Sequence, residues 1–178
     1  MASESEAVEW VQTASGAIAI RDAICVRWRS AAGEMTPDGD DVQAHLGEPL
    51  GEQTATPLPH GGGTAQLFRR GMIVARQDGR AFVVYGALYD SYLEAGGVTS
   101  ALGQPTSDEE ASPGGGRVAH FENADIYWRE DFGARVVRGP SRKRYATTGY
   151  PFRRSLLGRA ASFFVSSVRG LGSSLKRP

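Results

Sequence analysis

One stretch of this chain superimposes on another after a shift of 53 positions. Over the 36 positions from 61 to 96, 13 residues are identical to those 53 places later, without a gap. Repeats of this length are usually small supersecondary units that bury a core only by stacking on one another. The sequence therefore predicts an array of small units. The identical positions are Gly61, Gly62, Gly63, Phe68, Ile73, Arg76, Asp78, Ala81, Val83, Val84, Gly86, Tyr92 and Gly96.

Two further shifts set the limits of the array. A shift of 64 aligns residues 10–33 with the second half of a unit, and a shift of 56 aligns the start of one unit at Leu46 with the start of the next at Leu102. At a shift of 55, residues 155–158 repeat this start, and the match then stops. We predict a flexible N-terminus at 1–8, a half unit at 9–33, whole units at 46–97 and 102–150, and a tail at 151–178.

Each unit carries the pattern of a hairpin followed by a helix. The β-rich runs 65–75 and 118–129 precede a turn with aspartate and glycine and then a second strand. After each hairpin, an aromatic residue follows four places behind an apolar residue, or behind a serine in the last copy, and a glycine comes shortly afterwards. This spacing predicts short helices that contain Trp28, Tyr92 and Tyr145. We expect a mainly β fold with short helices. Proline and glycine predict loops at 34–44 and 52–63.

The start of the second whole unit carries a family resemblance. The segment from Gly96 to Glu109 reads GGVTSALGQPTSDE, and Phe121 and the doublet Tyr127-Trp128 follow it. This segment resembles the LGFP repeat of actinobacterial envelope proteins, specifically over 102–139 and more loosely over 46–86. The resemblance covers roughly residues 9–150.

The resemblance implies a propeller-like array of hairpins with one helix per unit. It also implies a role in holding secreted enzymes or surface proteins to cell-wall polysaccharide. Two features of this sequence depart from the family pattern. Residues 1–9 lack the basic start and apolar run of a secretory signal, and no catalytic domain accompanies the array. We expect a cytoplasmic protein, or one released as part of a particle that acts at the cell envelope.

The net charge of zero hides an asymmetry between the body and the tail. Residues 1–137 contain 10 basic and 20 acidic residues, whereas residues 138–178 contain 10 basic residues and no acidic residue. Such a division indicates that the tail meets an anionic surface, which is an acidic protein, a lipid headgroup layer or nucleic acid.

The tail also has the spacing of an amphipathic helix. Its apolar positions follow one another at intervals of four and three, which places them on one helical face beside basic residues. This pattern favours docking on the array or on another subunit, including a homo-oligomer, over binding to a membrane surface. Nucleic acid is the least favoured partner. The predicted docking residues are Leu157, Ala161, Phe164, Val168, Leu171 and Leu175, with Arg154, Arg159 and Arg169.

Residues for catalysis are scarce. The three histidines do not have the spacing of a helical metal pair, and neither a nucleophile elbow nor a phosphate-binding loop is present. The single cysteine, Cys25, fits a buried helix position. We expect a non-enzymatic protein without a metal or a cofactor.

Carboxylates and aromatic rings are the candidates for ligand binding. Asp108 and Glu109 could accept hydrogen bonds from sugar hydroxyls, and indole or phenol rings stack on sugar rings. For each residue a structural role is the alternative, as a turn acceptor or in packing between units. The candidates are Trp128, Tyr127, Asp108, Glu109, Trp10 and Tyr85.

The sequence thus favours an adaptor. It would recognise a cell-wall glycan or an envelope or particle protein, while its basic tail docks on a larger assembly. One alternative is a purely structural subunit of a phage-tail-like or injection particle. Another is a membrane-surface protein anchored by its tail.

Overall fold

Three antiparallel sheets follow one another along the chain. The computed structural model describes residues 7–57, 61–113 and 115–148. Its elements are β1 (Val8–Thr13), β2 (Gly16–Arg21), α1 (Asp22–Ser30), α2 (Val42–Leu46), β3 (Thr54–Ala55), β4 (Gly63–Phe68), β5 (Gly71–Arg76), β6 (Ala81–Tyr85), α3 (Gly86–Glu94), the 3-10 turn η2 (Gly97–Thr99), β7 (Glu110–Ala111), β8 (Arg117–His120), β9 (Ala124–Arg129), β10 (Gly133–Arg138) and α4 (Ser141–Thr148).

Each whole unit forms a four-stranded sheet followed by a helix. The strand orders are β3-β4-β5-β6 and β7-β8-β9-β10, and the half unit supplies the two-stranded sheet β1-β2. The phenylalanine-centred run, expected to precede a single hairpin, is itself a hairpin. It turns at residues 69–70 in the first unit and 122–123 in the second. The regions expected to be loops contain the short elements α2 and β3.

Equivalent residues of the two whole units occupy equivalent backbone settings. Phe68 and Phe121 are both fully buried, and each forms an isolated antiparallel bridge, to Pro49 and Pro105 respectively. Gly63 and Gly116 are also equivalent, because a side chain at either position would overlap a carbonyl oxygen of the paired strand. The tandem repeat inferred from the 53-residue shift is therefore confirmed.

The starting segment of each unit holds the turn of its own hairpin. The Arg70 N–H donates to the Leu46 carbonyl at 3.1 Å, and the Asn123 N–H donates to the Leu102 carbonyl at 3.0 Å. Leu46 and Leu102 are both fully buried. The leucine-glycine start thus seals one side of the sheet that follows it, which explains why it recurs with each unit.

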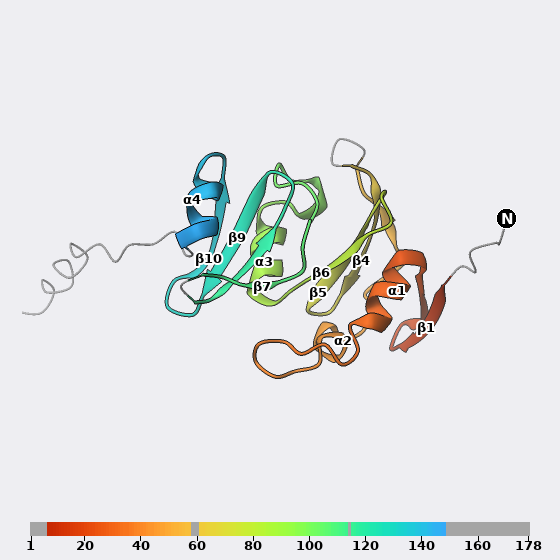
Figure 1. Ribbon diagram of the computed structural model, residues 1–178. Helices are drawn as coiled ribbons and strands as arrows, with labels where there is room; N and C mark the ends of the chain where they lie inside the picture. Colours follow the sequence, from red (N-terminus) through yellow and green to blue (C-terminus); the bar gives the residue numbers. More distant parts are fainter. Residues whose placement is uncertain (1–6, 58–60, 114, 149–178) are drawn as a thin grey trace, which may run out of the picture.

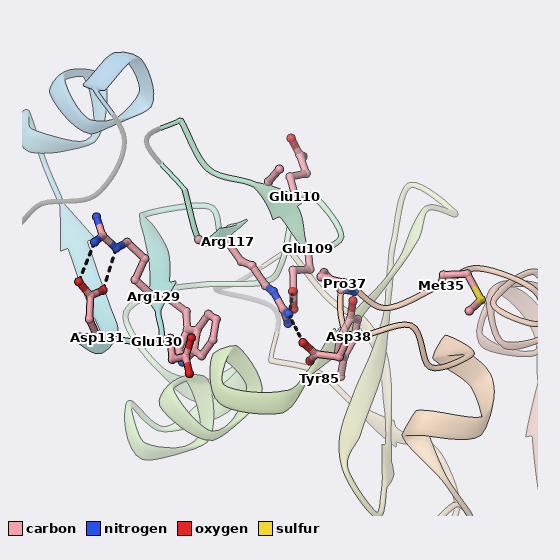
Figure 2. A pocket seen from close by; sticks show the side chains of 13 residues that line it. Met35, Pro37, Asp38, Tyr85, Glu109, Glu110, Arg117, Arg129, Glu130 and Asp131 are labelled. Atoms are coloured by element: carbon pink, nitrogen blue, oxygen red, sulfur yellow. Dashed lines mark hydrogen bonds and ion pairs between the residues drawn. The ribbon is translucent and has the colours of Figure 1, made fainter.

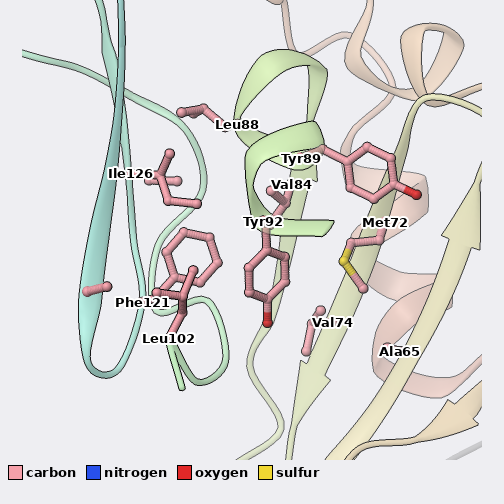
Figure 3. Close-up of a cluster of buried hydrophobic side chains, with 12 residues drawn as sticks. Ala65, Met72, Val74, Val84, Leu88, Tyr89, Tyr92, Leu102, Phe121 and Ile126 are labelled. Carbon is pink, nitrogen blue, oxygen red and sulfur yellow. The ribbon is translucent and has the colours of Figure 1, made fainter. Parts of the chain in front are cut away.

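Helices and sheets alternate in the molecule (Figure 1). Helix α1 contacts β5 and β6 of the next sheet, and α3 contacts β9 and β10 of the sheet after that. Figure 3 shows the second of these junctions, where Leu88 and Tyr92 of α3 lie between Val74 of their own sheet and Ile126 of the next. The Tyr92 and Phe121 ring centroids are 4.5 Å apart. Each unit buries its helix against its neighbour, as an array requires.

The propeller-like closure expected from the resemblance is not found in the part of the chain that the structure describes. Because α1 and α3 each lie between their own sheet and the next, the sheets form a row and do not converge on one axis (Figure 1). The predicted amphipathic helix and all nine of its docking residues lie outside the described residues.

Candidate ligand-binding groove

A groove opens where the loop after α1 faces the sheet of the second whole unit. Its volume is about 890 Å³. Figure 2 shows side chains from this loop, from the end of β6 and from β7 to β9 gathered around it. The lining residues are Met35, Pro37, Asp38, Tyr85, Glu109, Glu110, Ala111, Gly116, Arg117, Trp128, Arg129, Glu130 and Asp131. The loop after α1, the first whole unit and the second whole unit all contribute, so the groove exists only when the units are stacked.

Arg117 organises the floor of the groove. Its guanidinium lies 3.0 Å from the Glu109 carboxylate and 3.1 Å from that of Asp38, so one cation is shared by two anions (Figure 2). The guanidinium carbon is also 5.1 Å from the centroid of the Trp128 ring, within the range of a cation–π contact. Trp128 and Arg117 face each other on neighbouring strands, which fixes this contact.

Glu109 is a buried carboxylate. Its side chain is 5% exposed, and no aligned hydrogen bond reaches its Oε1 from a described residue, although Arg117 forms an ion pair with it. Burial raises the pKa of Glu109, and the charge of Arg117 opposes this effect only in part. Beside it, burial and then the charge of Glu109 raise the pKa of Tyr85 to about 12. The Tyr85 hydroxyl therefore stays neutral at physiological pH.

The first unit lacks this arrangement at the same positions. The pairing of β3 with β4 and β5 matches that of β7 with β8 and β9, so Arg117 and Trp128 correspond to Thr64 and Ala75. Thus the pair of Arg117 and Trp128 has no counterpart in the first unit.

The comparison with known families agrees with this internal repeat. The family model described as LGFP repeat matches the chain at residues 46–100 and again at 102–151. The chain belongs to the LGFP repeat family. The two matches coincide with the two whole units, and the half unit at the N-terminus lies outside both. No curated protein matches the chain.

Three of the six predicted ligand residues line the groove of this LGFP repeat protein: Trp128, Glu109 and Tyr85. Their side chains come from three different elements, and the sequence alone did not bring them together. The other groove residues that matter, Asp38 and Arg117, were not predicted. Arg117 could have been noticed as a departure from the repeat, since Thr64 precedes it by 53 positions.

Asp108 lies at a junction between units. It accepts a hydrogen bond from the Val83 N–H at 2.7 Å and forms an ion pair with Arg27 at 3.2 Å. Glu52, at the equivalent place in the first unit, accepts from the Ala19 N–H at 3.4 Å. This matches the alternative in which the acidic residue after the proline satisfies a backbone donor and links neighbouring units.

Tyr127 and Trp10 lie away from the groove. Tyr127 is 1% exposed and packs with Val118 and Val137 under α4, where it cannot reach a sugar. Trp10 is 61% exposed on β1, with the Arg21 guanidinium 5.5 Å from its ring. It pairs across the strand with Ala19, on the far hairpin of the half unit.

The two histidines among the described residues have structural settings. His45 lies edge-on to the Tyr85 ring, with centroids 5.4 Å apart, and His120 is 2.8 Å from the Asp125 carboxylate. Within residues 7–57, 61–113 and 115–148, no group of three metal-ligating side chains comes together. Over the same ranges, no helix has the length and apolarity needed to cross a bilayer.

Proposed function

We propose that this LGFP repeat protein is a non-enzymatic binding protein of the cell envelope and that its groove binds cell-wall polysaccharide. The observation that carries the proposal is the convergence of Trp128, Glu109 and Arg117 with the exposed Asp38 in one open groove. Membership of the LGFP repeat family supports the proposed association with the envelope.

The groove has the chemistry that a hydroxyl-rich chain requires. Carboxylates accept strong hydrogen bonds from hydroxyl groups, and Arg117 and Arg129 donate to ring and glycosidic oxygens. Trp128 and Tyr85 give it an apolar wall. The groove is open and has a volume of about 890 Å³. This shape suits a segment of a polymer better than it suits a small metabolite, which usually binds in an enclosed pocket.

The stacked units hold this groove in shape. Met35, Pro37 and Asp38 come from the loop after α1, Tyr85 ends β6, and the other lining residues belong to the second unit. Because these elements are joined by buried junctions, the groove is preformed and a ligand does not have to order it. Preformed sites lose less affinity to ordering than flexible ones.

The basic segment beyond Arg138 completes the proposal. It carries 9 basic residues and no acidic residue over 139–178. We assign it to docking on a larger envelope or particle assembly, while the groove binds the wall.

Retention on insoluble arabinogalactan–peptidoglycan tests the proposed function. We expect the wild-type protein to sediment with this material, and Asp38→Ala together with Trp128→Ala to weaken retention about tenfold or more, as expected when several polar and aromatic contacts are lost. Trp10→Ala is the matched control, since it removes an exposed indole outside the groove. Thermal unfolding of each variant checks that the array stays folded. Equal retention of the groove variant and the wild type would reject the groove as the wall-binding site.

A further inference from the structure

We propose that the groove selects glycans bearing free amino groups, with Glu109 and Asp38 as the residues that bind the ammonium. This inference rests on the proposed function and names the ligand chemistry of the same groove. It depends on one comparison within the chain and on the charge balance of the groove.

The first unit provides an internal control for Glu109. The equivalent residue there is Gln53, directly after Glu52 just as Glu109 follows Asp108. The Gln53 amide donates to the Arg21 carbonyl at 2.8 Å, which satisfies a backbone acceptor at the junction. An ionised carboxylate cannot donate in this way. In the second unit the chain therefore buries a charge at a position where an amide serves the structure.

A buried carboxylate is costly unless something compensates it. Arg117 compensates Glu109 only in part, because the same guanidinium also pairs with Asp38. The three groups together carry one excess negative charge. A cation arriving beside Asp38 would remove this excess, so the arrangement is complementary to a positively charged ligand group.

The lining of the whole groove also carries an excess of negative charge. Its lining contains five carboxylates and two guanidinium groups, of which Arg129 already pairs with Asp131. Neither Glu110 nor Glu130 forms an ion pair with a described residue. An anionic glycan would be repelled here, and a neutral glycan would gain nothing from the excess charge.

The position of Arg117 argues against sugar stacking as the main attraction. Its guanidinium already lies over the Trp128 ring, while the ring also packs against the core cluster of α3. A sugar would have to displace this cation to stack on the indole face. An ammonium group can reach the Asp38 carboxylate without displacing the guanidinium, since this side chain is 74% exposed.

Binding of two matched oligosaccharides by titration calorimetry tests the inference. The probes are a glucosamine hexamer and an N-acetylglucosamine hexamer, which differ only in the acetylation of the amines. We expect the wild-type protein to bind the amine form at least about tenfold more tightly, the effect of a charge-assisted contact in a partly desolvated site. In Glu109→Gln, which installs the residue of the first unit, the preference should fall to about twofold or less. Glu48→Gln, an exposed carboxylate outside the groove, should leave it unchanged.

Thermal unfolding shows whether Glu109→Gln folds, and Asp38→Asn gives a second variant on an exposed loop that should also reduce the preference. Equal affinity of the wild type for the two hexamers would overturn the inference. A lysine hexamer that binds as tightly as the glucosamine hexamer would also overturn it, because the groove would then recognise a basic peptide. If wall retention depends on the groove but the hexamers are not distinguished, the proposed function stands and only the amine selectivity fails.

Discussion

At the scale of single residues, a polar network attaches the last helix to its sheet. Arg142 of α4 binds the Asp125 carboxylate through two nitrogens, at 2.8 and 3.1 Å, and donates to the carbonyls of Phe121 and Glu122. The His120 Nδ1–H donates to the Asp125 Oδ1 at 2.8 Å, the oxygen that also accepts from the Arg142 Nη2. The Asp125 side chain is 3% exposed, so the network lies within the unit although α4 itself is at the end of the array.

The network predicts a pH window of stability. The hydrogen bond to Asp125 raises the pKa of His120. His120 therefore contributes fully to the free energy of unfolding below about pH 6.5, and this contribution is lost as the pH rises through the pKa of His120 in the folded state. Burial alone would raise the pKa of Asp125, but hydrogen bonds from His120 and Arg142 lower it. Asp125 therefore contributes to the free energy of unfolding above about pH 3.9, and this contribution is lost as the pH falls through the pKa of Asp125 in the folded state.

The first unit suggests the variant that tests this window. In it, the equivalent positions carry apolar side chains, Leu67, Met72 and Tyr89. Urea unfolding over a range of pH should show the network's contribution of about 2 kcal/mol between about pH 4 and 6.5 in the wild type. This pH-dependent component should be absent in His120→Leu/Asp125→Met/Arg142→Tyr. The same pH profile in both proteins would show that the network does not titrate as described.

At the scale of elements, the acidic residue after the proline of the second unit connects three parts of the array. Asp108 lies in the segment before β7, its partner Val83 belongs to β6, and Arg27 belongs to α1. The shared position of Glu52 shows that the connection is part of the repeat, and the shorter hydrogen bond of Asp108 shows that the second junction is the tighter one.

Removing these carboxylates should therefore have unequal effects. We expect Asp108→Ala to lower the free energy of unfolding by about 1–2 kcal/mol, because the Val83 N–H loses its acceptor and Arg27 loses an ion pair. Glu52→Ala, with its longer bond of 3.4 Å, should cost about 0.5 kcal/mol. Denaturant unfolding of the two variants measures the difference. A larger loss for Glu52→Ala would show that the junctions are held in another way.

The elements also show what the sequence could and could not predict. The shifts of 53 and 64 residues and the spacing within each unit located the last hairpin of each whole unit and the helices at Trp28, Tyr92 and Tyr145, because spacing within a unit reflects local geometry. It missed the turn after Phe68, since Arg69-Arg70 carries neither glycine nor proline and the flanking strands are continuous in β-forming residues. A turn that lacks glycine and proline and lies within a run of β-forming residues cannot be recognised from the spacing of the sequence.

At the scale of the whole molecule, function depends on how the units stack. A ring was expected from the family resemblance, but the arrangement of layers is decided by which sheet each helix contacts, and this is a tertiary property. The groove could not be predicted as a unit for the same reason. Asp38 and Arg117 are 79 positions apart, and they meet only because α1 packs on the sheet that precedes the second unit.

The stacked array confines the groove to one place along the molecule. The first whole unit has Gln53, Thr64 and Ala75 where the second has Glu109, Arg117 and Trp128. The repeat therefore supplies one scaffold twice and one binding surface once. In this account the first unit, with the half unit before it, supports the loop that bears Asp38.

The three tryptophans offer the most direct measurement of this account, because each has one indole N–H signal in a nitrogen–proton correlation spectrum. Trp128 lines the groove, Trp10 is exposed on the half unit, and Trp28 packs within the core. Titration with a soluble fragment of wall polysaccharide should shift the Trp128 signal, assigned through Trp128→Phe, and leave the other two in place. A ligand that binds while the Trp128 signal stays fixed would contradict the assignment of the groove.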